Sequence, residues 1–125
     1  MLNLNAIILF SENPGKLVAF YKKILGMDPG WTGGDFTGFK VGSGFLTIGP
    51  HSDVKGTAKD PKRMMFFFET TDVAGQHKRM VGLGAKEIAA PYHPGEASDM
   101  WLSTLADPDG NYFQLATPMD MTKSN

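Results

Sequence analysis

The sequence contains no cysteine among its 125 residues. Disulfide bonds, zinc–thiolate sites, iron–sulfur clusters and a cysteine nucleophile are therefore all excluded. The lack of disulfides is compatible with a reducing compartment. The opening stretch MLNLNAIILF also lacks the basic start and the small-residue cleavage site of a signal peptide. We therefore expect the protein to be cytoplasmic.

The sequence also lacks long apolar runs and concentrated basic charge. No apolar run approaches the roughly 20 residues that span a bilayer, so no membrane partner is expected. The formal net charge is −1, and the Lys and Arg residues are scattered. Nucleic-acid binding needs a basic patch, so no nucleic-acid partner is expected either. The hydrophobic fraction of 42% and the charged fraction of 20% are those of an ordinary globular domain.

The first half of the chain predicts one strand and one amphipathic helix, followed by further strands. The β-branched run Asn5–Phe10 predicts a buried strand. A helix is predicted over Asn13–Leu25, because Asn13 can cap it, Pro14 suits its first turn and Gly26 can end it. Helical spacing places these residues on its apolar face: Leu17, Val18, Tyr21, Ile24 and Leu25.

Two more strands are predicted in this half, over Phe36–Val41 and Phe45–Gly49, and residues 51–62 form a polar linker. The second half then begins with an apolar strand, Met64–Thr70. A helix follows in TDVAGQHKRMVGLG, with Asp72 as its cap. We expect its buried side to consist of Val73, Met80, Val81 and Leu83.

Three strands are predicted to close the second half, in KEIAAPYHP, DMWLSTLADPDG and NYFQLATP. The residues Asp107–Asn111 are of the types that a tight turn selects, so we interpret them as structural rather than catalytic. The order strand, helix and three strands thus occurs twice. Modules of this size bury little surface and would each be only marginally stable alone. We therefore expect one α+β domain, residues 1–118, with modules at about 4–50 and 63–118 and a C-terminal tail at 119–125.

Three stretches carry a resemblance to a known family. LNAIILFSENPGKLVAFYKKILGM resembles the first strand and helix of the vicinal oxygen chelate superfamily, and RMMFFFETTDVAGQHKRMVGLGAKEI resembles the start of its second module. LADPDGNYFQLATP is similar to its closing hairpin. The superfamily includes glyoxalase I, bleomycin resistance proteins, fosfomycin resistance enzymes and extradiol dioxygenases. The resemblance implies two βαβββ modules whose paired, curved sheets surround a cleft for a small molecule.

The resemblance also implies four positions for the family's divalent metal ligands, which are usually His, Gln or Glu. These positions fall on Ala6, near Thr47, on Met65 and on Gln114. A shift of one residue on the first strand would offer Asn5 instead. None of these side chains is a carboxylate or an imidazole, which a hard divalent cation prefers. We therefore expect no metal or other cofactor, with a divalent metal held in an unusual way as the alternative.

Gln114 has two interpretations. Strand alternation places it on one face with Tyr112 and Ala116, and places Phe113 and Leu115 on the face that should meet a helix. Gln114 then points into the expected cleft, where its amide can both donate and accept hydrogen bonds to a ligand. The alternative is an amide that pairs only with a neighbouring strand or with water.

Aromatic residues and one histidine complete the candidate site. Phe66, Phe67 and Phe68 cannot all face one side of a sheet, so one or two should lie beside Met65 in the cleft. His93 is a weak candidate for acid–base chemistry, since histidine changes charge near neutral pH, but it could equally be a solvated loop residue. We expect His77 to lie on the surface of its helix. The other aromatic residues near the expected cleft are either core or ligand contacts: Trp31, Phe36, Phe39, Tyr92 and Trp101.

Three functions remain open from the sequence. The first is a metal-free binder of a small apolar or aromatic molecule, similar to bleomycin resistance proteins. The second is a glyoxalase-type lyase, isomerase or dioxygenase with an atypical metal site, and the third is an interaction protein with a vestigial cleft. We also expect a homodimer, as members of the superfamily commonly pair. The predicted ligand contacts are Gln114, Met65, Thr47, Phe67, Trp101, Tyr92 and Phe39.

Overall fold

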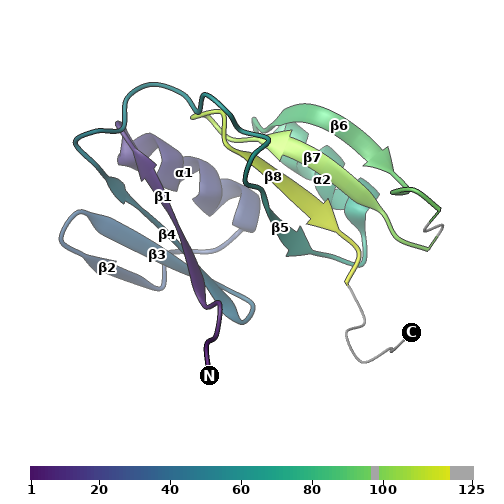
Figure 1. The fold of residues 1–125 in the computed structure, drawn as a ribbon, viewed down its shortest axis with the longest axis horizontal. Helices are drawn as coiled ribbons and strands as arrows, with labels where there is room; N and C mark the ends of the chain where they lie inside the picture. Colours follow the sequence, from purple (N-terminus) through teal and green to yellow (C-terminus); the bar gives the residue numbers. More distant parts are fainter. Residues whose placement is uncertain (97–98, 119–125) are drawn as a thin grey trace. The chain divides into compact units, whose positions relative to one another are not determined.

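The computed structural model describes residues 1–96 and 99–118. The expected tail, residues 119–125, lies outside this part of the chain. The chain forms two compact units, Met1–Ala58 and Lys59–Asn125, each with a strand, a helix and three further strands (Figure 1). The α+β class and the two βαβββ modules are therefore confirmed.

In the first unit, one helix packs on a four-stranded sheet. The strands lie in the order β1-β4-β3-β2, with β1 parallel to β4 and the other pairs antiparallel. The short strand β2 could not be located from the sequence, because its three residues are too few to show an alternating pattern. The elements are β1 (Ala6–Ser11), α1 (Pro14–Leu25), β2 (Trp31–Gly33), β3 (Phe36–Val41) and β4 (Gly44–Pro50).

The ends and the buried face of α1 follow the predicted pattern. The side chain of Asn13 accepts a hydrogen bond from the Lys16 N–H at 3.3 Å, and Gly26 ends the helix with φ of 65°. This left-handed conformation favours glycine. The helix buries Leu17, Phe20, Tyr21 and Ile24, whereas Val18 and Leu25 are only partly buried. On the sheet side the core consists of Phe39, Leu46 and Ile48.

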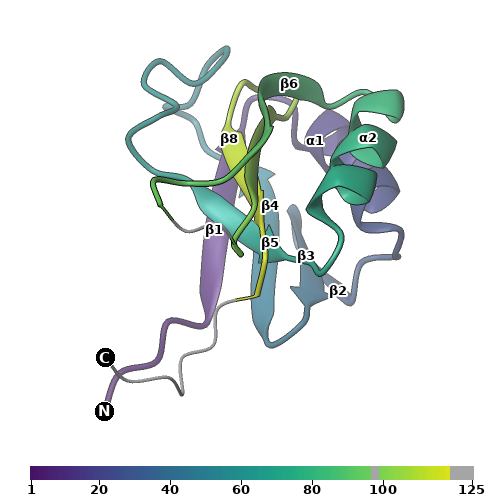
Figure 2. The ribbon, with the colours of Figure 1, turned by 90° about the vertical axis from the view of Figure 1, so that its right-hand side faces the viewer.

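The second unit repeats this arrangement. Its strands lie in the order β5-β8-β7-β6, with β5 parallel to β8 and the remaining pairs antiparallel. The helix α2 contacts β6, β7 and β8 and lies on one face of the sheet (Figure 2). The elements are β5 (Phe66–Glu69), α2 (Val73–Gly82), β6 (Lys86–Tyr92), β7 (Leu102–Ala106) and β8 (Tyr112–Ala116).

Two predictions about α2 are wrong at its C-terminal end. Val73 and Met80 are buried as expected, but Val81 and Leu83 are exposed. The helix ends at Gly82, and its buried stripe runs through Val73, His77 and Met80 at intervals of four and three residues. Val81 lies outside this stripe, and Leu83 follows the last helical residue.

The prediction that His77 lies on the surface is also wrong. It occupies the middle of the buried stripe, and only 4% of its surface is exposed. Its Nε2 lies 2.7 Å from Oε2 of Glu87 on β6, which accepts the hydrogen bond. The sequence pattern missed this residue because a carboxylate from another element makes burial of the imidazole possible.

The turn between β7 and β8 is held by one carboxylate. Oδ1 of the buried Asp107 accepts hydrogen bonds from the backbone N–H groups of Asp109 (2.9 Å) and Asn111 (3.0 Å). The side-chain amide of Asn111 donates to both carboxylate oxygens. These contacts agree with the interpretation of Asp107–Asn111 as a structural turn.

Both helices are short, with 12 residues in α1 and 10 in α2. Within residues 1–96 and 99–118, neither is long and apolar enough to cross a membrane.

The packing of α1 gives a direct test of the first unit. Leu17 and Ile24 are fully buried, so Leu17→Ala or Ile24→Ala should lower the free energy of unfolding by about 2–5 kcal/mol. Lys16→Ala, on the exposed side of the same helix, is the matched control and should change it by less than about 0.5 kcal/mol. Urea denaturation measures the free energy of unfolding of the parent protein and of all three variants. A loss below about 1 kcal/mol for both core variants would contradict the helix placement.

Candidate ligand-binding faces

In each unit the helix covers one face of the sheet, and strand alternation directs the remaining side chains to the opposite face. We call these opposite faces the open faces. Strand register aligns one residue from each strand into a central row across each face. In the first unit the row is Ile8, Thr47, Gly38 and Trp31. In the second it is Phe67, Gln114, Thr104 and Ala89.

The two rows make Thr47 and Gln114 equivalent positions of the internal repeat. Each lies on the last strand of its unit, between the first and third strands. Ile8 and Phe67 are likewise equivalent, so Ala6 and Met65, two residues earlier in each unit, also correspond. The four positions that the family resemblance implied therefore form two matched pairs.

Aromatic rings lie flat on the open face of the first unit because two glycines make room for them. A Cβ atom at Gly38 would overlap the indole of Trp31, and one at Gly49 would overlap the ring of Phe36. Ile8 and Trp31 remain 52% and 43% exposed. The open face of this unit is thus apolar, and Thr47 in its central row is buried, with 8% of its surface exposed.

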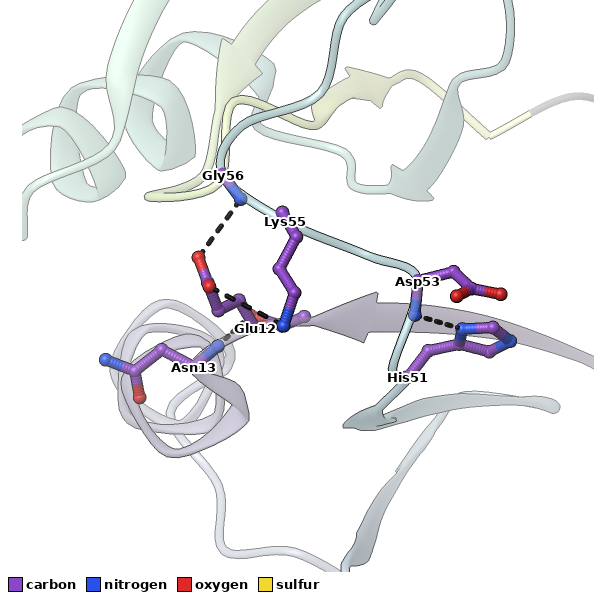
Figure 3. Close-up of polar contacts among 7 residues, drawn as sticks. Glu12, Asn13, His51, Asp53, Lys55 and Gly56 are labelled. Atoms are coloured by element: carbon purple, nitrogen blue, oxygen red, sulfur yellow. Dashed lines mark hydrogen bonds and ion pairs between the residues drawn. The ribbon is translucent and has the colours of Figure 1, made fainter.

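His51 directly follows the last residue of β4 and begins a loop beside this face. The His51 ring contacts the Phe10 ring, with their centroids 5.2 Å apart. Its Nδ1 accepts a hydrogen bond from the Asp53 N–H at 3.1 Å. The Glu12 carboxylate holds this loop. It accepts a hydrogen bond from the Gly56 N–H at 3.2 Å and forms an ion pair with Lys55 Nζ at 3.9 Å (Figure 3).

Phe39 was predicted to contact a ligand, but its position contradicts this. It pairs with Leu46 on β4 and is fully buried with Leu46 and Ile48 on the helix-covered side. A ligand on the open face could not reach its ring. The sequence of β3 alone does not show which face Phe39 takes, because this depends on the register that pairs it with Leu46.

Gln114 lies on the open face of the second unit, as alternation predicted. Phe113 and Leu115 are fully buried on the other side. The half-buried Gln114 amide donates from Nε2 to the Thr104 hydroxyl at 3.2 Å, which is the one side-chain hydrogen bond that it makes among the described residues. The carbonyl oxygen and the second N–H of this amide retain their capacity for a further partner.

Phe67 is the neighbour of Gln114 in the central row, and 45% of its surface is exposed. Phe66 and Phe68 turn the other way, and their rings pack on Phe113 at centroid distances of 5.9 and 5.8 Å. The expected division of the three phenylalanines is therefore observed. Met65, two residues before Phe67, is 39% exposed.

Tyr92 and Trp101 lie away from this central row. Tyr92 is exposed and pairs with Leu102, on the same open face as Gln114. The Trp101 ring instead contacts the His93 ring, with a centroid separation of 3.8 Å. Since a carbonyl oxygen can only accept, His93 donates from Nδ1 to the Met100 carbonyl at 2.8 Å. A neutral His93 therefore has its free lone pair on Nε2, which suits a proton acceptor.

The donor chemistry of the open faces does not fit the family's divalent metal. In the first unit, Thr47 lies between Ile8 and Gly38. In the second, Gln114 donates an N–H to Thr104. A hard cation needs anionic oxygens or imidazoles to offset its dehydration. The four family positions provide only the Thr47 hydroxyl, the Met65 thioether and the Gln114 amide, because Ala6 has no donor atom. Among the described residues, no three His, Cys, Asp or Glu side chains cluster closely enough to hold a metal ion.

Three residues on or beside the open faces were not identified from the sequence. Thr104 follows from the pairing of β7 with β8, Ile8 from that of β1 with β4, and His51 from its contact with Phe10. The alternation within each strand was readable, but the register between strands was not. The spacing of Ile8 two residues after Ala6 is the only sequence signal that could have indicated one of them.

The sequence model of the glyoxalase-like domain family matches residues 6–116. No curated protein sequence matches the chain significantly.

Solved structures share the fold at low sequence identity. A glyoxalase-related enzyme from Fulvimarina pelagi is 19% identical, with a TM-score of 0.75 over 99% of this chain and 96% of that chain. A glyoxalase/bleomycin resistance protein/dioxygenase family enzyme from Burkholderia phytofirmans PsJN is 19% identical, with a TM-score of 0.71 over 94% and 100%. Lactoylglutathione lyase from Agrobacterium tumefaciens is 16% identical, with a TM-score of 0.69 over 92% of this chain and 92% of that chain.

The family match extends from the first residue of β1 to the last residue of β8, and so includes every strand of both open faces. The chain therefore belongs to the glyoxalase-like domain family, within the vicinal oxygen chelate superfamily.

Proposed function

We propose that the protein binds a small, largely apolar and aromatic molecule without the help of a metal ion, with Gln114 orienting the ligand. The observation that carries the proposal is the neighbouring pair of Phe67 and Gln114 on the open face of the second unit. An exposed ring offers a flat apolar contact, and the amide beside it offers both a donor and an acceptor.

The energetics favour an apolar ligand. Burial of apolar surface contributes about 25 cal/mol per Å2, so a ligand covering Phe67 and Met65 gains affinity mainly by removing their exposed surface from water. One hydrogen bond to Gln114 adds about 0.5–1.5 kcal/mol and selects the orientation. Thr104 supports this role because it fixes one N–H of the amide, which limits the rotation of the side chain.

A screen of aromatic metabolites and antibiotics by thermal shift, followed by titration of the hits, tests the proposal. A true ligand should raise the melting temperature of the parent protein. Gln114→Ala should weaken its binding by about 2- to 10-fold, the range given by one hydrogen bond. Phe67→Ala should weaken it as well, because the exposed ring is lost.

Gln76→Ala is the matched control for this experiment. It makes the same chemical change on α2, where Gln76 accepts a hydrogen bond from Arg79 rather than facing the open side of the sheet. Its affinity for the ligand should equal that of the parent. If the Gln114 and Phe67 variants bind every hit as tightly as the parent and the Gln76 variant do, the assigned role of the open face is refuted. This outcome would favour an interaction protein.

Metal titration separates this proposal from a glyoxalase-type lyase, isomerase or dioxygenase. Because the family positions Ala6, Thr47, Met65 and Gln114 carry no charge and no imidazole, calorimetric titration with nickel, manganese or zinc should show no stoichiometric binding that depends on them. Stoichiometric binding that disappears in Gln114→Ala would instead support the metal-dependent enzyme.

We also propose that the protein is a homodimer. Large apolar side chains outside the proposed ligand contacts, including Leu4, Met64, Val81 and Leu83, are more than a third exposed, and apolar surface of this kind often forms protein interfaces. Sedimentation velocity at micromolar concentration should give the mass of two chains. A single species of one chain under these conditions would contradict the proposal.

A further inference from the structure

We infer that His51 is a fixed hydrogen-bond donor that selects planar apolar ligands carrying an acceptor oxygen, such as a carbonyl, on the open face of the first unit. This inference goes beyond the proposed function, which assigns the ligand contacts to Phe67 and Gln114 on the open face of the second unit. Its basis is the hydrogen bonding of the His51 ring together with the aromatic surface beside it.

The backbone fixes which nitrogen of His51 carries the proton. The Asp53 N–H can only donate, so Nδ1 of His51 accepts this hydrogen bond through its lone pair. A neutral ring then carries its proton on Nε2, where it is available to a partner outside the chain. His93 has the opposite arrangement, because its Nδ1 donates to the Met100 carbonyl. Of these two exposed histidines, His51 is therefore the donor.

The His51 ring is also held in position. Its centroid lies 5.2 Å from that of Phe10, with an interplanar angle of 74°, which is a favourable edge-to-face contact. The loop that follows His51 forms a turn, in which the Val54 N–H donates a hydrogen bond to the His51 carbonyl at 3.1 Å. Glu12, at the end of β1, holds the next residues of the loop through Lys55 and Gly56 (Figure 3).

The surface next to this donor is a row of aromatic rings. Phe10 lies between His51 and Phe36, and the Phe10 and Phe36 centroids are 6.2 Å apart. Ile8, two residues before Phe10 on the same face, is 52% exposed. A flat apolar molecule on this row gains from burial, and an oxygen at its edge can accept from His51 Nε2. A hydrocarbon of the same shape gains only the burial.

Nitrogen chemical shifts of the histidine rings give the first test. In the free protein at neutral pH, two-dimensional NMR of the ring nitrogens should show the neutral His51 protonated on Nε2 and the neutral His93 protonated on Nδ1. Protonation of neutral His51 on Nδ1 would overturn the inference, since Nε2 would then be an acceptor.

The second test uses two probes of nearly equal shape, 2-acetylnaphthalene and 2-ethylnaphthalene, which differ by the carbonyl oxygen. Backbone NMR titration should show both probes shifting Ile8 and Phe10, with the ketone binding about 3- to 10-fold more tightly. His51→Phe keeps an aromatic ring, and His51→Asp keeps an acceptor for the Asp53 N–H but has no side-chain N–H donor. Both variants lose the Nε2 donor, so both should bind the two probes equally.

His93→Phe is the control and should keep the preference for the ketone. If the two His51 variants retain this preference, the inference is wrong while ligand binding by the protein stands. If neither probe shifts the first unit, the inference is also wrong, and the ligand titrations of the Gln114 and Phe67 variants decide the proposed function separately. Phe10→Ala should weaken the binding of both probes, because it removes the ring between His51 and Phe36.

Discussion

Within residues 1–96 and 99–118, each unit has a single helix to cover a four-stranded sheet, and this constraint decides the role of nearly every strand residue. Successive side chains of a strand point to opposite faces, so the face under the helix takes the core residues and the other face takes what remains. Leu46 and Ile48 are buried beneath α1, while Thr47 between them faces the open side. In the second unit Phe113 and Leu115 are buried, and Gln114 lies between them on the open face.

The chemistry on the open faces differs from that of a metal-dependent member of the superfamily. Where a metal site needs charged oxygens or imidazoles, the equivalent positions Thr47 and Gln114 are neutral hydrogen-bonding groups. Around them the faces present rings and aliphatic side chains, among them Trp31, Ile8 and Phe67. Neutral polar groups within an apolar surface are typical of sites that orient a small molecule by shape and hydrogen bonds.

Much of the fold could be predicted because its signals are local. The α1 helix, its Asn13 cap and its Gly26 end depend on a few neighbouring residues, as does the turn around Asp107. The order of the elements followed from the same local patterns, and the family resemblance implied the same order. The three-residue strand β2 was missed because it is shorter than the period needed to recognise it.

The candidate site was harder to predict because its residues come together through strand register and through contacts between elements. Alternation placed Gln114 and Phe67 correctly, since it needs only the local sequence. The expectation that Phe39 contacts a ligand was wrong, because the face on which it lies depends on its pairing with Leu46. Helical spacing did not indicate the burial of His77, which Glu87 on another element makes possible, and no local pattern indicated the position of His51 beside Phe10.

The claim that the open face of the second unit binds an apolar molecule without a metal is tested most directly by NMR in the presence of EDTA. A 15N-labelled protein titrated with an aromatic hit from the ligand screen should show its largest backbone shifts at Phe67, Thr104 and Gln114, which lie side by side in the central row. Shifts confined to α2, or binding that appears only after a divalent metal is restored, would contradict the account.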